Sequence, residues 1–107
     1  MKKIGQVVYV KPGRLEEYKA LHRAVWPEVL EKIKECGITN YSIFSRDNML
    51  FTYFEYVGDD YERDMAKMAE HIKTQEWWSV CKPCLQRIET EAVSDCWADM
   101  EQIFDFN

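Results

Sequence analysis

The residues best suited to do chemistry lie on one short stretch, where Tyr18, His22 and Trp26 recur at four-residue steps. At about 3.6 residues per turn, side chains with this spacing stack along one face of a helix. The unperturbed pKa of histidine, roughly 6.5, lets an imidazole give and take protons near neutrality. Tyr18, one turn before His22, can orient a hydroxyl-bearing ligand or share in a proton transfer. The stretch therefore predicts an acid–base site, against the alternative of a structural or solvated histidine.

A second unusual feature is the adjacent pair Trp77 and Trp78, in a chain whose aromatic share is 14%. Neighbouring side chains on a helix point in different directions, so the two rings cannot both enter one core. The faces of tryptophan rings favour the C–H faces of sugars and other rings. The pair predicts either one ring that faces a ligand cavity, or one core ring and one ring at an interface.

The four cysteines raise the question of zinc or redox chemistry; they are Cys36, Cys81, Cys84 and Cys96. A structural zinc site usually combines two close pairs of ligands, and neither His22 nor His71 completes such a pattern here. The WSVCKPC stretch over 78–84 resembles a thioredoxin-type pair, but it lies inside or just after an expected helix instead of at a helix start. We therefore expect buried, unreactive thiols and no metal site, and we expect His71 to be exposed.

The length of 107 residues fits one compact domain over 1–107. The net charge is −5, with 14 Lys and Arg scattered among 19 Asp and Glu. Such a surface is a poor partner for nucleic acid. No apolar run approaches the roughly 18 residues of a membrane span. The first six residues lack the apolar region of a secretory signal, so we expect a cytoplasmic protein.

The first half of the chain alternates strand and helix signals. The expected elements are a strand over 3–10, a helix from Arg14 to Val25, a helix from Glu28 to about Glu35, and strands over 38–45 and 49–56. Lys11-Pro12-Gly13 is a turn signal, and Pro27 interrupts the helical pattern. Gly37 suits a left-handed helix cap, and the two later strands are expected to form a hairpin.

The second half begins with a helix capped by Asp59 or Asp60. Its buried stripe is expected to comprise Met65, Met68, Ala69 and Ile72. Another helical piece is expected from Thr74, a linker over 93–95, and a last strand over 100–106.

The element order β-α-β-β-α-β predicts an α+β, ferredoxin-like fold, with a four-stranded antiparallel sheet and helices on one face. The second and third strands carry apolar side chains on both faces, with Tyr41 and Ile43 on one alternation and Phe44 on the other. A sheet that is apolar on both faces needs a cover. We expect a homodimer through the sheet, over the alternative of a monomer with a ligand cleft on that face.

Several blocks of the sequence resemble the L-rhamnose mutarotase family. The blocks are Glu17-Tyr18-Lys19-Ala20-Leu21-His22 with Val25-Trp26-Pro27-Glu28, then Gly37–Phe44, Thr74–Trp78, Pro83-Cys84 and Trp97–Phe104. They run from the first strand to the last in one register, so together they are more specific than any single motif. The resemblance implies a ferredoxin-like fold and dimers that form through the sheet.

The resemblance also implies an activity, the interconversion of the α and β anomers of L-rhamnose without cofactor or metal. It implies that His22 is the proton donor, acting on the ring oxygen, and leaves the base unassigned. The implied sugar-binding residues are Tyr18, Tyr41, Trp77 and Trp78.

Three alternatives remain open at this point. One is a mutarotase for L-fucose, another 6-deoxy-L-hexose that differs from L-rhamnose in hydroxyl stereochemistry. Another is a non-catalytic sugar-binding or regulatory module that uses the same aromatic residues. The third is a haem- or oxygen-using enzyme, since one fold hosts many activities.

Overall fold

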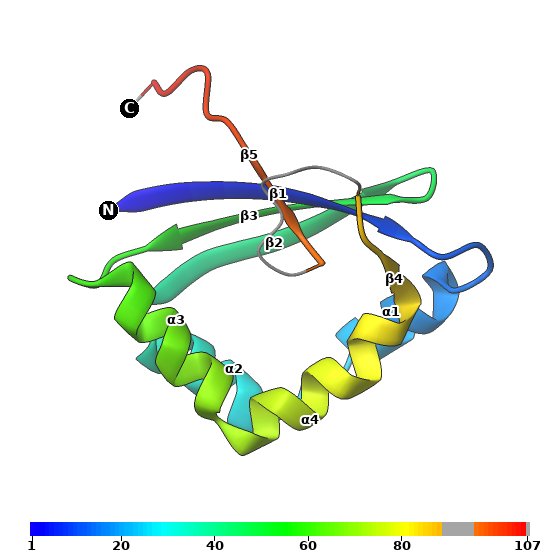
Figure 1. The fold of residues 1–107 in the computed structure, drawn as a ribbon, viewed down its shortest axis with the longest axis horizontal. Helices are drawn as coiled ribbons and strands as arrows, with labels where there is room; N and C mark the ends of the chain where they lie inside the picture. The colour runs from blue at the N-terminus through cyan, green and yellow to red at the C-terminus, as the bar shows by residue number, and fades with distance from the viewer. Residues whose placement is uncertain (89–95, 107) are drawn as a thin grey trace.

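The computed structural model describes residues 1–88 and 96–106, and in this part of the chain one curled antiparallel sheet carries all of its helices on one side (Figure 1). The strands are β1 (Lys2–Val10), β2 (Ile38–Arg46), β3 (Met49–Tyr56), β4 (Leu85–Gln86) and β5 (Ala98–Met100). The helices are α1 (Leu15–His22), α2 (Pro27–Glu35), α3 (Tyr61–Glu70), α4 (Ile72–Cys81) and the short 3₁₀ helix η1 (Lys82–Cys84). The expected α+β, ferredoxin-like class is confirmed.

The strand order is β2-β3-β1-β4, with β5 also paired to β1. In the antiparallel register Val8 lies opposite Leu50, and Ile43 lies opposite Thr52. Because side chains alternate between the faces of a strand, these residues point to the face that the helices cover. Val8 and Leu50 are almost fully buried there, so the core lies between the sheet and the helices.

The first helix is shorter than expected, and this shortening determines where His22 lies. It ends at His22 and not at Val25, and α2 then starts at Pro27. Trp26 has an extended backbone, with φ −62° and ψ 134°, because the ring of a following proline disfavours helical geometry in the preceding residue. Pro27 itself is well placed at the first helical position, where no backbone donor is needed.

The C-terminal strand is also shorter than expected. Only Ala98–Met100 pair with β1, whereas residues 101–106 carry no strand and are exposed. The prediction of a strand over 100–106 was therefore wrong for most of its length. The two-residue strand β4 was not predicted, because its pairing with Tyr9 and Val10 depends on tertiary contact alone.

Around α3 and α4 the sequence was partly misread. Asp60 caps α3 by accepting a hydrogen bond from the Arg63 amide, as expected. Ala69 is exposed and Ile72 is 68% exposed, because α3 ends at Glu70 and its stripe does not continue. The prediction of an exposed His71 was wrong. Its half-buried ring caps α4, with Nδ1 accepting from the Thr74 amide at 3.3 Å.

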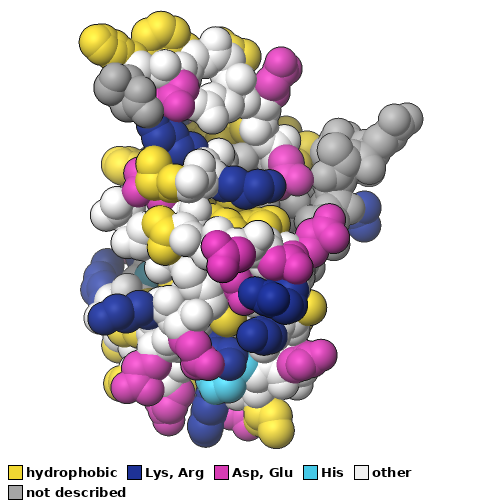
Figure 2. Space-filling view, turned by 90° about the vertical axis from the view of Figure 1, so that its left-hand side faces the viewer, with side chains coloured by type: hydrophobic (Ala, Val, Ile, Leu, Met, Phe, Trp, Pro, Cys, Tyr) yellow, Lys and Arg dark blue, Asp and Glu magenta, His cyan; other side chains and the backbone are white. Residues whose placement is uncertain are grey.

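The sheet face away from the helices is partly apolar and open. Phe44 is 66% exposed there, and in the C-terminal segment that follows β5 Phe104 is 78% exposed. Figure 2 shows hydrophobic side chains at the top, where Figure 1 places the C-terminus, and acidic and basic side chains intermixed below. No helix in residues 1–88 and 96–106 is long and apolar enough to cross a membrane. The expected linker over 93–95 lies outside the described residues.

Candidate active site

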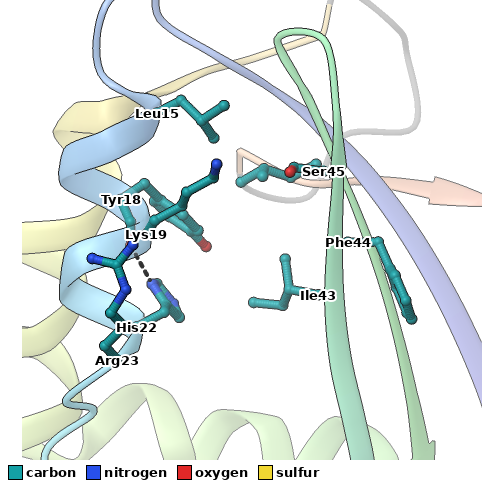
Figure 3. Close-up of a pocket in the computed structure, with 9 residues that line it drawn as sticks. Leu15, Tyr18, Lys19, His22, Arg23, Ile43, Phe44 and Ser45 are labelled. Carbon is teal, nitrogen blue, oxygen red and sulfur yellow. Dashed lines mark hydrogen bonds between the residues drawn. The ribbon is translucent and has the colours of Figure 1, made fainter.

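Helix α1 brings Tyr18 and His22 together, as their spacing predicted. Their rings stack with centroids 4.2 Å apart and an interplanar angle of 24°. Tyr18 is 5% exposed, and its side chain points across the space between α1 and β2 (Figure 3). Burial raises the pKa of Tyr18 well above its usual value, so its phenol keeps its proton throughout the neutral range.

The imidazole of His22 is fixed by a backbone contact. Its Nδ1 lies 3.0 Å from the carbonyl oxygen of Tyr18 (Figure 3), and a carbonyl can only accept. Nδ1 therefore carries a proton, and Nε2 is the nitrogen left for a ligand. Burial lowers the pKa of His22 below its ordinary value, and the hydrogen bond to Tyr18 partly opposes this shift. At neutral pH the ring is mostly neutral, with a lone pair on Nε2.

Helix α4 places Trp77 against the same histidine. The ring centroids of Trp77 and His22 are 5.4 Å apart in an edge-to-face arrangement. Trp26, from the break after α1, meets Trp77 at 5.3 Å in the same manner. Trp77 is 6% exposed, so it is the core ring of the tryptophan pair. Its contact with His22 shields the imidazole from water on one side.

A cavity of about 300 Å³ opens between α1 and the hairpin of β2 and β3 (Figure 3). The lining residues are Leu15, Tyr18, Lys19, His22 and Arg23 from α1 and its end, Ile43, Phe44 and Ser45 from β2, and Leu50 from β3. In Figure 3 Ile43 points toward α1, whereas the ring of Phe44 points away from the cavity. A volume of this order lies within the range of small-molecule sites.

Tyr41 reaches the helix-covered face of the sheet through a β-bulge. The pairing of β2 with β3 shifts between Thr39 and Ser42, and Asn40 has a φ of 48°. The ring of Tyr41 therefore lies beside Phe54, with centroids 5.4 Å apart. Tyr41 is 45% exposed as a whole; partial desolvation of its phenol raises its pKa, and the nearby Thr52 hydroxyl lowers it. Tyr41 is not one of the residues that line the cavity, although its phenol acts electrostatically on that of Tyr18.

Trp78 is half-buried and does not line the cavity. The Lys82 ammonium lies 4.6 Å from the centroid of its ring. Of the five residues singled out from the sequence, Tyr18 and His22 line the cavity, and Trp77 touches His22. The structure leaves Tyr41 and Trp78 outside the lining.

Sequence reasoning missed several lining residues, above all Ile43 and the cations Lys19 and Arg23. Lys19 directly follows Tyr18, and Arg23 directly follows His22. Helical spacing could therefore have predicted that both cations lie beside the Tyr18–His22 face. Ile43 shares its strand alternation with Tyr41, and this alternation was the signal that could have placed it in the site.

Metal ligands and reactive thiols are not part of this cavity. Within residues 1–88 and 96–106 no three His, Cys, Asp or Glu side chains are grouped to hold a metal ion. Cys81 and Cys84 are buried at the end of α4 and in η1, and burial raises the pKa of Cys81 to about 12. Such a thiol stays protonated and is a poor nucleophile.

Comparisons with known proteins identify the group to which this chain is related. The model of the L-rhamnose mutarotase family matches residues 3–106. The chain belongs to the L-rhamnose mutarotase family. An L-rhamnose mutarotase of Listeria monocytogenes is 38% identical over 80% of this chain and 82% of its own length. One of Lactiplantibacillus plantarum is 31% identical over 97% of both chains.

A solved member of the L-rhamnose mutarotase family supports the fold. The crystal structure of an L-rhamnose mutarotase from Formosa agariphila covers 100% of both chains with a TM-score of 0.79 and 22% identity. The family model and the relatives from Listeria monocytogenes and Lactiplantibacillus plantarum confirm the family resemblance expected from the sequence.

Proposed function

We propose that this chain interconverts the α and β anomers of L-rhamnose. The observation that carries the proposal is the placement of His22, whose Nδ1 is held by the Tyr18 carbonyl while the ring lines a cavity of small-molecule size. Membership of the L-rhamnose mutarotase family supports the choice of sugar.

In the proposed reaction the fraction of His22 that is protonated on both ring nitrogens donates the Nε2 proton to the ring oxygen of the sugar, which leaves the neutral ring with its lone pair on Nε2. The proton of the anomeric hydroxyl leaves to water, the bond between the anomeric carbon and the ring oxygen breaks, and an open aldehyde forms. The aldehyde turns about its bond to the next carbon, and the same steps in reverse close the ring on the other face. Atoms and charge balance over the cycle, and such acid–base help is typically worth about 10²–10⁴-fold.

The same proposal assigns sugar binding to the aromatic side chains around His22. Tyr18 has the best-supported role, because its phenol lies on the cavity side and keeps its proton to donate. Trp77 supports His22 through ring contact. Tyr41 and Trp78 are proposed as outer parts of the site that contact the sugar once it is bound.

Exchange NMR of the anomeric protons tests the function directly. With equilibrated L-rhamnose, cross-peaks between the α and β signals should need the protein, and His22→Asn should abolish them while sugar binding survives. Asn keeps a side-chain amide but does not titrate. Sugar binding without exchange in the native protein would instead favour a binding module, and faster exchange of L-fucose than of L-rhamnose would reassign the substrate.

We further propose that the protein is a homodimer formed through the open sheet face. Phe44 is 66% exposed on that face, and Ile103, Phe104 and Phe106 of the C-terminal segment are 77–89% exposed. Burying such an apolar surface against a second copy removes it from water. Light scattering should give twice the 12.8 kDa mass of one chain.

A charge placed on this face should separate the protomers. Phe44→Glu is expected to shift the mass toward one chain. Val80→Glu, at a 38% exposed position on α4, should leave the dimer intact. A monomer mass for the native protein at micromolar concentration would contradict the dimer.

We also propose that the protein works in the cytoplasm. Cys36, Cys81 and Cys84 are buried thiols without a disulfide, which fits a reducing compartment. Immunodetection in fractionated cells of the source organism should find the protein in the cytosolic fraction, and recovery from a secreted or membrane fraction would contradict this.

A further inference from the structure

One wall of the cavity is apolar and faces His22. Ile43 points from β2 toward α1, at the level of Tyr18 and His22 (Figure 3). Leu50 of β3, 2% exposed, adjoins it in the sheet, since Ile43 pairs with Thr52 and Ser45 with Leu50. The polar and charged side chains of the cavity lie mostly on the opposite wall, on α1.

The reaction proposed above constrains how a sugar sits against this wall. The ring oxygen must face Nε2 of His22 to receive its proton. In a hexopyranose the ring oxygen is bonded to C5, and C5 carries C6. Covalent geometry thus holds the C6 group next to the reacting ring oxygen. The C6 group must therefore lie in the part of the cavity nearest His22.

The chemistry of that part of the cavity distinguishes a methyl group from a hydroxymethyl group. Ile43 offers apolar contact and no hydrogen-bonding atom. Ser45 lies two residues farther along β2, toward Leu15 in Figure 3 and away from His22. A hydroxyl at C6 that lies against Ile43 would give up water without gaining a partner from this wall, because the polar groups of Tyr18, Lys19 and Arg23 lie on the opposite wall (Figure 3).

We propose that Ile43 is a specificity-determining residue, which receives the C6 methyl group of the sugar and selects 6-deoxyhexoses over their 6-hydroxy analogues. This inference rests on the proposed mutarotase function and deepens it. An apolar wall rejects an added hydroxyl only moderately, by about 10²-fold at most. The expected preference in kcat/KM is therefore about 10–100-fold.

The test compares three sugars that share the same ring stereochemistry and differ only at C5. L-Rhamnose carries a methyl group there, L-mannose a hydroxymethyl group, and L-lyxose neither. Exchange NMR with the native protein should rank L-rhamnose first, because its methyl group contacts Ile43 without a hydroxyl to desolvate, whereas L-mannose carries that hydroxyl and L-lyxose lacks the contact. Equal kcat/KM for L-rhamnose and L-mannose would overturn the inference, and this readout needs no variant.

A matched set of variants then assigns the preference to one residue. Ile43→Thr introduces a hydroxyl at nearly constant shape and should reduce the ratio of L-rhamnose to L-mannose about tenfold. Ile43→Val should retain most of the ratio, and so should Val80→Thr at an exposed site on α4. An unchanged ratio in a folded Ile43→Thr protein would overturn the assignment.

The outcomes separate this inference from the function on which it rests. If the native protein accelerates exchange of none of the three sugars, the proposed function itself fails. If it accelerates L-rhamnose and L-mannose alike, the mutarotase function stands and only the role of Ile43 fails.

Discussion

Nδ1 of His22 lies 3.0 Å from the carbonyl oxygen of Tyr18, one helical turn earlier. This bond fixes which nitrogen of the ring can exchange a proton with a ligand. His22 is also the last residue of α1, and the chain then turns away toward Trp26 and Pro27. The break before Pro27 therefore leaves the imidazole at the edge of the cavity.

Activity should depend on pH through His22. If the residue acts as the proton donor, kcat/KM should fall as pH rises through the pKa of the free enzyme. Because burial lowers the pKa of His22 from 6.5, the fall should begin on the acid side of that value. Exchange NMR over pH 5 to 9 measures the profile. His22→Asn should show a low, flat profile, and a rise of native activity with pH would make the neutral ring a base.

Tyr18→Phe should weaken sugar binding more than it slows the chemistry. The change removes one hydroxyl from the cavity side of a buried ring and leaves the backbone carbonyl that holds His22 in place. A neutral hydrogen bond contributes about 0.5–1.5 kcal/mol, so KM should rise about 3–10-fold with little change in kcat. A loss of kcat with KM unchanged would instead place the phenol in the proton transfer.

The left-handed conformation of Asn40, at the bulge that precedes Tyr41, should contribute to the stability of the fold. Asn40 has a φ of 48°, and its side-chain amide donates to Glu55 at 2.7 Å. Asn40→Ala loses the hydrogen bond and strains the backbone, and it should lower the free energy of unfolding by about 1–3 kcal/mol. Asn40→Gly relieves the strain and should cost less. Urea unfolding of both variants checks the order, and equal losses would show that the conformation of Asn40 matters little.

Much of the site followed from local patterns in the sequence. The four-residue spacing of Tyr18 and His22 predicted their common face, and residue type limited the cap of α3 to Asp59 or Asp60, of which the structure uses Asp60. Strand alternation separated Tyr41 and Ile43 from Phe44, and the structure keeps this separation. These features depend on residues near one another in the chain.

The features that local sequence patterns did not predict depend on contacts between distant segments of the chain. The pairing of β4 with β1 leaves no periodic signal in two residues. The sequence did not show that strand pairing ends at Met100, because Ile103, Phe104 and Phe106 are residue types typical of a strand. In the single chain these three side chains are exposed. Likewise, nothing local indicated that Trp77 and not Trp78 would meet His22.

The contact between Trp77 and His22 leads to a spectroscopic prediction. Burial is the main cause of the lowered pKa of His22, and the Trp77 ring, 5.4 Å away, supplies part of that burial. Trp77→Phe leaves a smaller ring and admits water, so it should raise the pKa of His22 toward its ordinary value. Trp78→Phe is the matched control, because Trp78 makes no ring contact with His22 among the described residues.

Proton NMR titration measures this pKa directly. The chain has two histidines, and loss of one signal in His71→Gln assigns the other to His22. An upward shift in Trp77→Phe alone supports the shielding role. Equal shifts in both tryptophan variants, or none, would show that the imidazole is desolvated by other groups, and the cavity wall formed by Tyr18 would then be the cause to test.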